Sequence, residues 1–131
     1  MFSIIIPSYN NLNYLKICIK SIKKNSKYRH QIVVHVNEGS DGTKDFLNAE
    51  NIDYTWSNEN VGLCKAVNLA AKKSNMDYIV YSHDDFYFCP EWDKTILDEI
   101  KKIGHKNFYL SSTQINTFGL DYFNCGNDHH N

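Results

Sequence analysis

Short apolar runs alternate with helical patterns along this chain, from its first residue to about residue 112. We expect a strand at each run, because strands covered on both faces carry such continuous apolar stretches. The runs are Phe2–Ile6, Gln31–Val36, Asp53–Trp56, Tyr78–Ser82 and Phe108–Ser111. Strand followed by helix, repeated in this way, predicts an α/β fold with a mostly parallel sheet and right-handed crossovers.

Between the runs, apolar residues recur at three- and four-residue steps, which is the spacing of one face of a helix. The three sets are Leu12, Leu15, Ile19 and Ile22, then Leu63, Val67 and Ala70, then Trp92, Ile96, Ile100 and Ile103. Pro90 would start the last helix well, with the acidic Glu91 and Asp93 in its first turn. We find no linker or internal repeat, so residues 1–131 are expected to form a single domain.

Composition supports a folded, soluble domain and limits its partners. The chain has 131 residues, 42% of them hydrophobic, and its 14 Lys and Arg residues face 15 Asp and Glu residues. This balance gives no global positive field of the kind that holds nucleic acid.

The apolar start is cut off at Pro7, far short of a membrane span. The widely spaced cysteines predict free thiols in a reducing compartment, here the cytoplasm; they are Cys18, Cys64, Cys89 and Cys125.

In parallel α/β sheets the ligand lies beyond the carboxyl ends of the strands. That rule selects four loops, which hold most of the unusual polar residues of the chain: 7–11, 37–42, 57–62 and 83–90. The sequence has no G-x-G-x-x-G after the first strand and no G-K-[ST] phosphate loop. Their absence argues against dinucleotide oxidoreductases and P-loop enzymes.

The loop after the fourth strand carries two adjacent carboxylates, Asp84 and Asp85, among aromatic residues. Such a pair is costly to bury unless a cation or donor groups compensate its charge. Mg²⁺ and Mn²⁺ favour carboxylate oxygen and complete their coordination with water and substrate phosphate. The alternative is a solvated pair that caps the following turn. The strand-end position favours the metal, and His83 beside it either contacts phosphate or has a packing role.

The loop after the second strand places Glu38 before two glycines, Gly39 and Gly42. Glycines allow tight turns, so Glu38 can come close to a planar ligand and accept a hydrogen bond from a base imino group. A helix entry capped by Ser40 or Asp41 is an equally open role for this loop, and it does not exclude ligand binding by Glu38.

Two further loops offer possible ligand contacts. Pro7, Ser8 and Tyr9 end the first strand, and the Tyr9 ring can stack on a nucleobase. Lys65 and Asn68 could reach a ligand from the first turns of the third helix, although a lone lysine on a helix is more often exposed to solvent.

Together these loops resemble the family 2 glycosyltransferases, a large group of inverting enzymes with the GT-A fold. The resemblance runs from Phe2 to about Trp92 and rests on SIIIPSYN at 3–10, VNEGSDGT at 36–43, NENVGLCKAVNLAA at 58–71 and YIVYSHDDFYFCP at 78–90. It implies a Rossmann-like, three-layer α/β/α sandwich with a mostly parallel central sheet. From Ile96 onward the likeness is faint.

The resemblance also implies roles for individual residues. Residues 7–9 would line the nucleoside pocket, and Glu38 would read the base. Asp84 would face the ribose, while Asp85 would be the direct ligand of a Mg²⁺ or Mn²⁺ ion that bridges the diphosphate. Two departures leave the exact base and sugar open, because many relatives carry Asp at the position of Asn37 and a different residue at His83.

The catalytic base expected in this family follows the metal motif, where few acids remain. Asp121 and Asp128 are the only acids past residue 99. Asp121 is the candidate general base, with a plain turn residue as the alternative reading.

The sequence therefore predicts metal-dependent, inverting transfer of a sugar from a nucleotide sugar, expected to be a UDP-sugar, to a glycan, lipid or protein acceptor hydroxyl. Most of the acceptor-binding half of the family is expected to be missing from this chain. The alternative is accordingly a non-catalytic or truncated nucleotide-sugar-binding module that needs a further domain or partner. A sugar nucleotidyltransferase is disfavoured, since no basic, glycine-rich triphosphate loop lies near the amino terminus.

Overall fold

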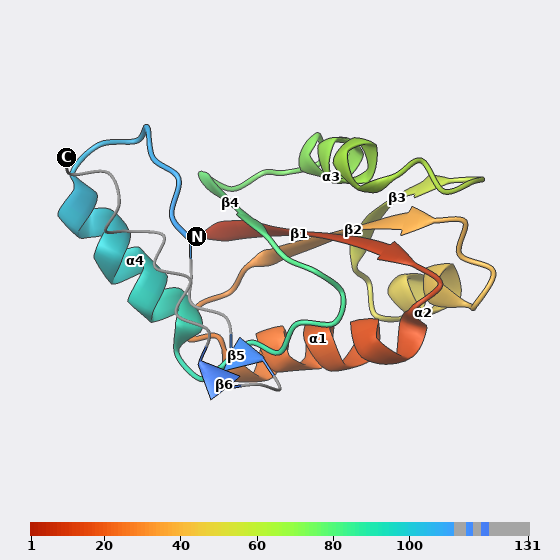
Figure 1. Ribbon diagram of the computed structural model, residues 1–131, viewed down its shortest axis with the longest axis horizontal. Helices are drawn as coiled ribbons and strands as arrows, with labels where there is room; N and C mark the ends of the chain where they lie inside the picture. The colour runs from red at the N-terminus through yellow and green to blue at the C-terminus, as the bar shows by residue number, and fades with distance from the viewer. Residues whose placement is uncertain (112–114, 117–118, 121–131) are drawn as a thin grey trace. The chain divides into compact units, whose positions relative to one another are not determined.

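The computed structural model describes residues 1–111, 115–116 and 119–120 (Figure 1). The chain divides into two compact units, Met1–Asp98 and Glu99–Asn131. The first unit contains a four-stranded sheet of order β3-β2-β1-β4, in which every neighbouring pair is parallel. The second contains an antiparallel pair, β5 (Ile115–Asn116) and β6 (Gly119–Leu120).

Strands and helices alternate through the first unit, as the sequence predicts. The strands of the sheet are β1 (Phe2–Tyr9), β2 (Gln31–Asn37), β3 (Asp53–Ser57) and β4 (Tyr78–Tyr81). The helices are α1 (Leu12–Asn25), α2 (Thr43–Ala49), α3 (Leu63–Ala71) and α4 (Trp92–Ile103), and the boundary between the two units falls within α4. The predicted α/β fold with a mostly parallel sheet is confirmed.

The three layers follow from the strand order. The chain steps outward from β1 to β2 to β3 and then returns past both to β4. Right-handed crossovers put the first two connecting helices on one face of the sheet and the third on the other. Figure 1 shows this arrangement, with α1 and α2 on one side of the strands and α3 on the opposite side.

The core lies on both faces of β1 and β2. On one face, Ile5 and Val33 pack with Ala70 of α3, and all three side chains are fully buried. Side chains alternate along a strand, so Ile4 and Ile6 point to the other face, where α1 lies. The buried residues of α1 are Leu15, Cys18, Ile19, Ser21 and Ile22.

Three expectations of the sequence analysis need correction. Phe108–Ser111 forms no strand; its Tyr109 is 92% exposed, and no described residue pairs with this backbone. Pro90 does not start α4, because Glu91 has a left-handed φ of 59° and the helix begins only at Trp92. The first strand continues through Pro7 to Tyr9.

Proline can occupy the central strand because pairing with β4 stops before it is reached. The register of β1 with β4 ends at Ile5, opposite Tyr81, whereas β1 pairs with β2 as far as Tyr9. At Pro7 the strand therefore has a neighbour on one side only, and the missing N–H group can face the side that has none.

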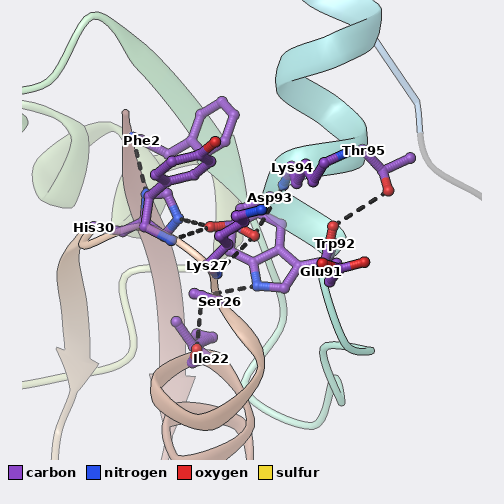
Figure 2. Close-up of polar contacts among 11 residues, drawn as sticks. Phe2, Ile22, Ser26, Lys27, His30, Glu91, Trp92, Asp93, Lys94 and Thr95 are labelled. Atoms are coloured by element: carbon purple, nitrogen blue, oxygen red, sulfur yellow. Dashed lines mark hydrogen bonds and ion pairs between the residues drawn. The ribbon is translucent and has the colours of Figure 1, made fainter.

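At the amino end of the sheet, one buried carboxylate fixes the start of α4 (Figure 2). Asp93 accepts hydrogen bonds from the backbone N–H groups of Lys27 (3.0 Å), Tyr28 (2.8 Å) and Lys94 (2.9 Å). It also lies 2.9 Å from His30 Nε2, and both of these side chains are almost completely buried. We call Asp93 and its four partners the Asp93 network.

The tautomer of the histidine follows from its second contact. The backbone N–H of Phe2 donates to His30 Nδ1 over 3.3 Å, so Nδ1 is an acceptor and Nε2 carries the proton that is donated to Asp93. Trp92 adds an Nε1–H bond to Ser26 Oγ at 2.9 Å. The amino end of the sheet is therefore closed by polar groups that satisfy one another.

Candidate functional site

A cavity of about 350 Å³ lies at the carboxyl end of the sheet, where sequence analysis placed the ligand. Four separate segments contribute to its walls. Its lining residues are Pro7, Ser8, Tyr9, Asn10, Asn11, Asn37, Asn60, Leu63 and Asp84. Its surface is rich in amide and hydroxyl groups, which suit a polar ligand with several hydrogen-bonding atoms.

The two adjacent aspartates differ in their bonding. Ser8 Oγ donates to Asp84 Oδ2 over 2.7 Å, and Asn11 Nδ2 donates to Asp84 Oδ1 over 3.0 Å. Asp85 is exposed and accepts no hydrogen bond from any residue that the structure describes. One carboxylate is thus oriented at the cavity wall, and the next is free to bind a cation.

The loop between β2 and α2 is held in a constrained conformation. Glu38 has a φ of 64°, a left-handed value that is uncommon for a residue other than glycine. Its backbone is fixed on both sides, since its N–H donates to the Ser57 carbonyl (3.0 Å) and its carbonyl accepts from Trp56 Nε1 (2.8 Å). Such strain persists only where the surroundings enforce it, and these two hydrogen bonds hold the Glu38 backbone in place.

The Glu38 carboxylate lies close to the cavity, although Glu38 is not one of its lining residues. Its negative charge, together with a side-chain hydrogen bond, raises the pKa of the Tyr9 hydroxyl, and Tyr9 does line the cavity. Ser40 Oγ donates to the same carboxylate over 3.3 Å. The ring of Tyr9 is half exposed, and its face is available to a planar ligand.

Asp41 ties two of the site loops together. Its Oδ2 accepts from the N–H of Leu12 (2.9 Å) at the start of α1, and its Oδ1 accepts from both the N–H (3.1 Å) and the hydroxyl (2.7 Å) of Thr43. Burial acts to raise the pKa of Asp41, but these hydrogen bonds outweigh it and lower the pKa overall. Asp41 therefore holds the entry to α2, but the N-cap is Gly42, and neither Ser40 nor Asp41 occupies the predicted capping position.

Asn37 connects the cavity to a polar chain inside the sheet. Its Oδ1 accepts from the N–H of Val61 (3.0 Å) and lies 3.3 Å from Ser57 Oγ. The Ser57 hydroxyl in turn lies 3.2 Å from Nε2 of the fully buried His35, whose pKa is lowered by burial. Asn37 thus positions the loop that carries Asn60, another lining residue.

Behind the aspartates, the loop packs on α1. The Cys18 thiol contacts the His83 carbonyl at 3.5 Å, and burial raises the pKa of Cys18 to about 12. The thiol is therefore protonated and acts as a donor. His83 Nε2 lies 2.9 Å from the Tyr81 hydroxyl, and the His83 ring packs against Phe86.

The structure brings together most of the residues that the sequence selected. Residues 7–9 and Asp84 line one cavity, with Glu38 next to it and Asp85 next in the chain. Lys65 and Asn68 do not line it. Asp121 and Asp128 lie outside the described residues, so their predicted roles stay predictions.

Sequence reasoning missed the amides of Asn11, Asn37 and Asn60. In the sequence Asn37 stands out only as a departure from the family pattern, and Asn11 and Asn60 resemble any other polar residue of the selected loops. Asparagine in a loop is ordinarily a turn residue, so the signal was their gathering in three loops that meet at the same sheet edge.

Comparison with known proteins agrees with this geometry. Residues 3–127 match the family model described as Glycosyl transferase family 2. An uncharacterized glycosyltransferase of Rickettsia conorii is 31% identical in an alignment of 115 residues that covers 82% of this chain and 18% of that protein. A second, of Rickettsia felis, is 35% identical in an alignment of 96 residues that covers 67% of this chain and 15% of that protein. The chain thus spans less than a fifth of the length of these relatives.

Solved structures show the same fold. S. aureus TarS 1–349 in complex with UDP matches 88% of this chain and 39% of its own, with a TM-score of 0.71 and 19% identity. The mannosyltransferase PcManGT from Pyrobaculum calidifontis, in complex with GDP-Man and Mn²⁺, matches 88% of this chain and 35% of its own, with a TM-score of 0.68 and 21% identity. The fold is that of the GT-A glycosyltransferases, and with the family match it shows that this chain belongs to glycosyl transferase family 2.

Proposed function

We propose that this chain is the nucleotide-sugar-binding part of a metal-dependent, inverting glycosyltransferase that uses a UDP-sugar as donor. The observation that carries the proposal is the contrast between Asp84, which lines the cavity and is oriented by two donors, and the exposed Asp85 that follows it in the chain. Complexes of the structural neighbours with UDP, UDP-GlcNAc and GDP-Man support a nucleotide-sugar donor. This chain covers less than a fifth of the length of its Rickettsia relatives, so sugar transfer by a complete protein of that kind is also part of the proposal.

The donor set fits Mn²⁺ or Mg²⁺. Among the described residues, no group of three or more His, Cys, Asp or Glu side chains could hold a metal ion by itself. A hard cation at Asp85 suits this arrangement, because Mg²⁺ commonly takes one or two carboxylates and completes its shell with water and substrate phosphates. When bound, the cation would act as a Lewis acid that stabilises the departing nucleoside diphosphate.

The remaining residues would bind and orient the nucleotide. The Tyr9 ring offers a stacking face for the base, and Glu38 offers an acceptor for its imino group. Asp84 is kept in one orientation by Ser8 and Asn11, so its remaining lone pairs can accept hydrogen bonds from the ribose hydroxyls. We assign the general base to Asp121, which would take the proton of the acceptor hydroxyl as that oxygen attacks the sugar.

We also propose a cytoplasmic location. Cys18, Cys64 and Cys89 are free thiols, as expected in a reducing compartment. No helix in the described part of the chain is long and apolar enough to cross a membrane. The acceptor is a glycan, lipid or protein hydroxyl.

The metal site is tested by calorimetry with UDP and GDP, each in Mn²⁺ and in EDTA. We expect UDP to bind only with the cation, because two phosphates and two carboxylates repel each other in its absence. Asp85→Ala should lose this binding. Asp77→Ala removes an exposed carboxylate outside the cavity and should leave affinity unchanged. If UDP bound equally well in Mn²⁺ and in EDTA, the proposed metal dependence would be wrong. If GDP bound more tightly than UDP, the proposed donor would be a guanosine nucleotide sugar.

Transfer is tested separately, with a UDP-sugar panel and Mn²⁺, by following sugar release or transfer in a single turnover. Asp121→Asn should abolish transfer and preserve UDP binding if Asp121 is the base. Binding without transfer by the unaltered chain would favour the second candidate, a binding module that needs a further domain.

A further inference from the structure

One surface of the first unit is strongly basic. Residues 12–30, which form α1 and the loop that leads to β2, contain six of the 14 Lys and Arg residues of the chain and none of its 15 Asp and Glu residues. All six side chains are exposed: Lys16, Lys20, Lys23, Lys24, Lys27 and Arg29. We call these six residues the basic face. The remainder of the chain is net acidic, so this surface is a local concentration of positive charge.

Most of this charge is uncompensated. Lys23 pairs with Glu50 at 2.8 Å, and Lys16 Nζ lies 5.3 Å from the centre of the Phe46 ring. The other four cations have no acidic partner among the described residues. Lys16, Lys20 and Lys24 also follow one another at four-residue steps, and like charges so placed destabilise a helix. An anionic partner would relieve this repulsion.

Apolar side chains stand beside the lysines. On α1, Tyr14 is 58% and Ile17 is 54% exposed, and Tyr28 in the following loop is 43% exposed. These residues do not belong to the core, which α1 meets with Leu15 and Ile19 on its other side. A helix with a basic polar face and exposed aromatic and aliphatic residues is typical of segments that lie in the interface of a membrane.

We propose that the basic face docks this chain on the surface of an anionic phospholipid bilayer. Clusters of four to eight Lys or Arg residues on an amphipathic helix are attracted to anionic lipid surfaces. Five of the six cations are lysines, which act as point charges and lack the bidentate geometry with which Arg recognises individual phosphates. The apolar side chain of Ile17 would be buried at the boundary between the lipid head groups and acyl chains, which is energetically favourable. A nucleic acid backbone offers no comparable apolar environment.

The cavity next to the basic face is not suited to recognise one particular lipid head group. A cavity of about 590 Å³ is lined partly by Lys23, Tyr28 and Arg29, but also by Glu50 and Asp53. The two carboxylates oppose a bound phosphate there. Attraction should therefore depend on the surface charge of the bilayer and be similar for different anionic lipids at equal charge.

The basic face shares no residue with the nucleotide cavity. The proposal therefore goes beyond the proposed function, and either can fail without the other. Docking would add a peripheral contact with a membrane, which requires no membrane-spanning helix.

The test is co-sedimentation of the 131-residue chain with vesicles of phosphatidylcholine alone or mixed with phosphatidylglycerol. We expect binding only to the mixed vesicles, and weaker binding as salt rises. Replacement of two lysines in Lys20→Gln/Lys24→Gln should weaken binding by about 25-fold, at about fivefold per lysine. The matched control Lys72→Gln/Lys73→Gln removes two exposed charges that follow α3, and it should have no effect.

Further arms separate lipid binding from other causes. Ile17→Ser should weaken the part of binding that survives high salt, and phosphatidylserine should replace phosphatidylglycerol at equal charge. No variant should lower the melting temperature of the parent chain, and Lys20→Gln/Lys24→Gln should raise it slightly, because it removes the repulsion along α1. Equal binding to neutral vesicles, or an equal loss in both lysine pairs, would overturn the proposal. So would tighter binding to a single-stranded RNA oligonucleotide than to mixed vesicles, which would assign the basic face to nucleic acid.

Discussion

The two ends of the same parallel sheet use carboxylates in opposite ways. At the amino end, Asp93 is buried and its four hydrogen-bonding partners are all protein groups. At the carboxyl end, Asp84 is oriented by two donors, and Asp85 has no partner among the described residues. A buried charge needs its bonds to be complete within the fold, whereas a binding site keeps bonding capacity for its ligand.

Backbone strain does not distinguish the two ends. Left-handed residues other than glycine occur near the cavity, at Asn10 and Glu38, and also at the opposite end, at Asn51 and Glu91. What separates the ends is the state of the polar side chains. The amino end should therefore govern stability, and the carboxyl end should govern affinity.

The largest expected effect is on the Asp93 network. Asp93→Asn would remove the charge and direct an amide N–H group toward other donors. We expect the free energy of unfolding to fall by on the order of 3 kcal/mol, or about 10 °C in melting temperature. Denaturant and thermal unfolding measure this loss. Asp85→Asn is the matched change at the other end and should leave stability unchanged; a comparable loss there would contradict the division between the ends.

A change in the Glu38 turn should affect both properties. Gly39 has a φ of 75°, and an added Cβ would lie 2.5 Å from Val36 Cγ1, so the backbone would have to move. Gly39→Ala should cost about 1–3 kcal/mol of stability and weaken nucleotide binding by displacing Glu38. Gly42→Ala is the control, because Gly42 also has a left-handed φ of 88° but the atom nearest to its added Cβ is Leu12 Cδ2, at an ordinary contact distance of 3.8 Å. Denaturant unfolding should show the smaller loss of stability for Gly42→Ala, and equal losses would show that the clash with Val36 has no effect.

Acid should weaken the fold through the carboxylates of lowered pKa. For Asp93, burial acts to raise the pKa, but the bonds from Lys27, Tyr28, His30 and Lys94 lower it overall. A carboxylate with a lower pKa in the folded state stabilises the fold fully above its unfolded value of about 3.9. That stability is lost as pH falls through the folded pKa. Denaturant unfolding between neutral pH and pH 3 should show a steeper loss for the parent chain than for Asp93→Asn.

Much of the fold could be predicted because its signals are local. The apolar runs and helical spacing located all four strands of the sheet, and the carboxyl-end rule then located the cavity loops. Phe108–Ser111 shows the limit of this reasoning, because an apolar run becomes a strand only if another strand pairs with it. A single sequence does not say where the sheet ends.

The site was predicted only in part, for a similar reason. Asp84 stood out as half of a rare pair, but its donor Asn11 lies 73 residues away in sequence. Asp93 was expected only as a first-turn acid of a helix, whereas its bond to the Lys27 backbone spans 66 residues. Residue type indicates what a side chain can bond, and only the tertiary arrangement selects its partner.

The smallest expected effect compares one serine at each end of the sheet. Ser8→Ala removes the 2.7 Å bond to Asp84, but Asn11 still holds that carboxylate and water in the cavity can replace the lost donor. We expect UDP affinity to fall by about fivefold, or about 1 kcal/mol, with little change in stability. Ser26→Ala removes the acceptor of Trp92 Nε1–H, so it should lower stability by about 1–2 kcal/mol and leave UDP affinity unchanged. Calorimetry and denaturant unfolding of both variants provide the comparison. If Ser8→Ala destabilised the chain as much as Ser26→Ala does, the bond from Ser8 to Asp84 would serve mainly to stabilise the fold. The proposed role of Asp84 in ligand binding would then lose its support.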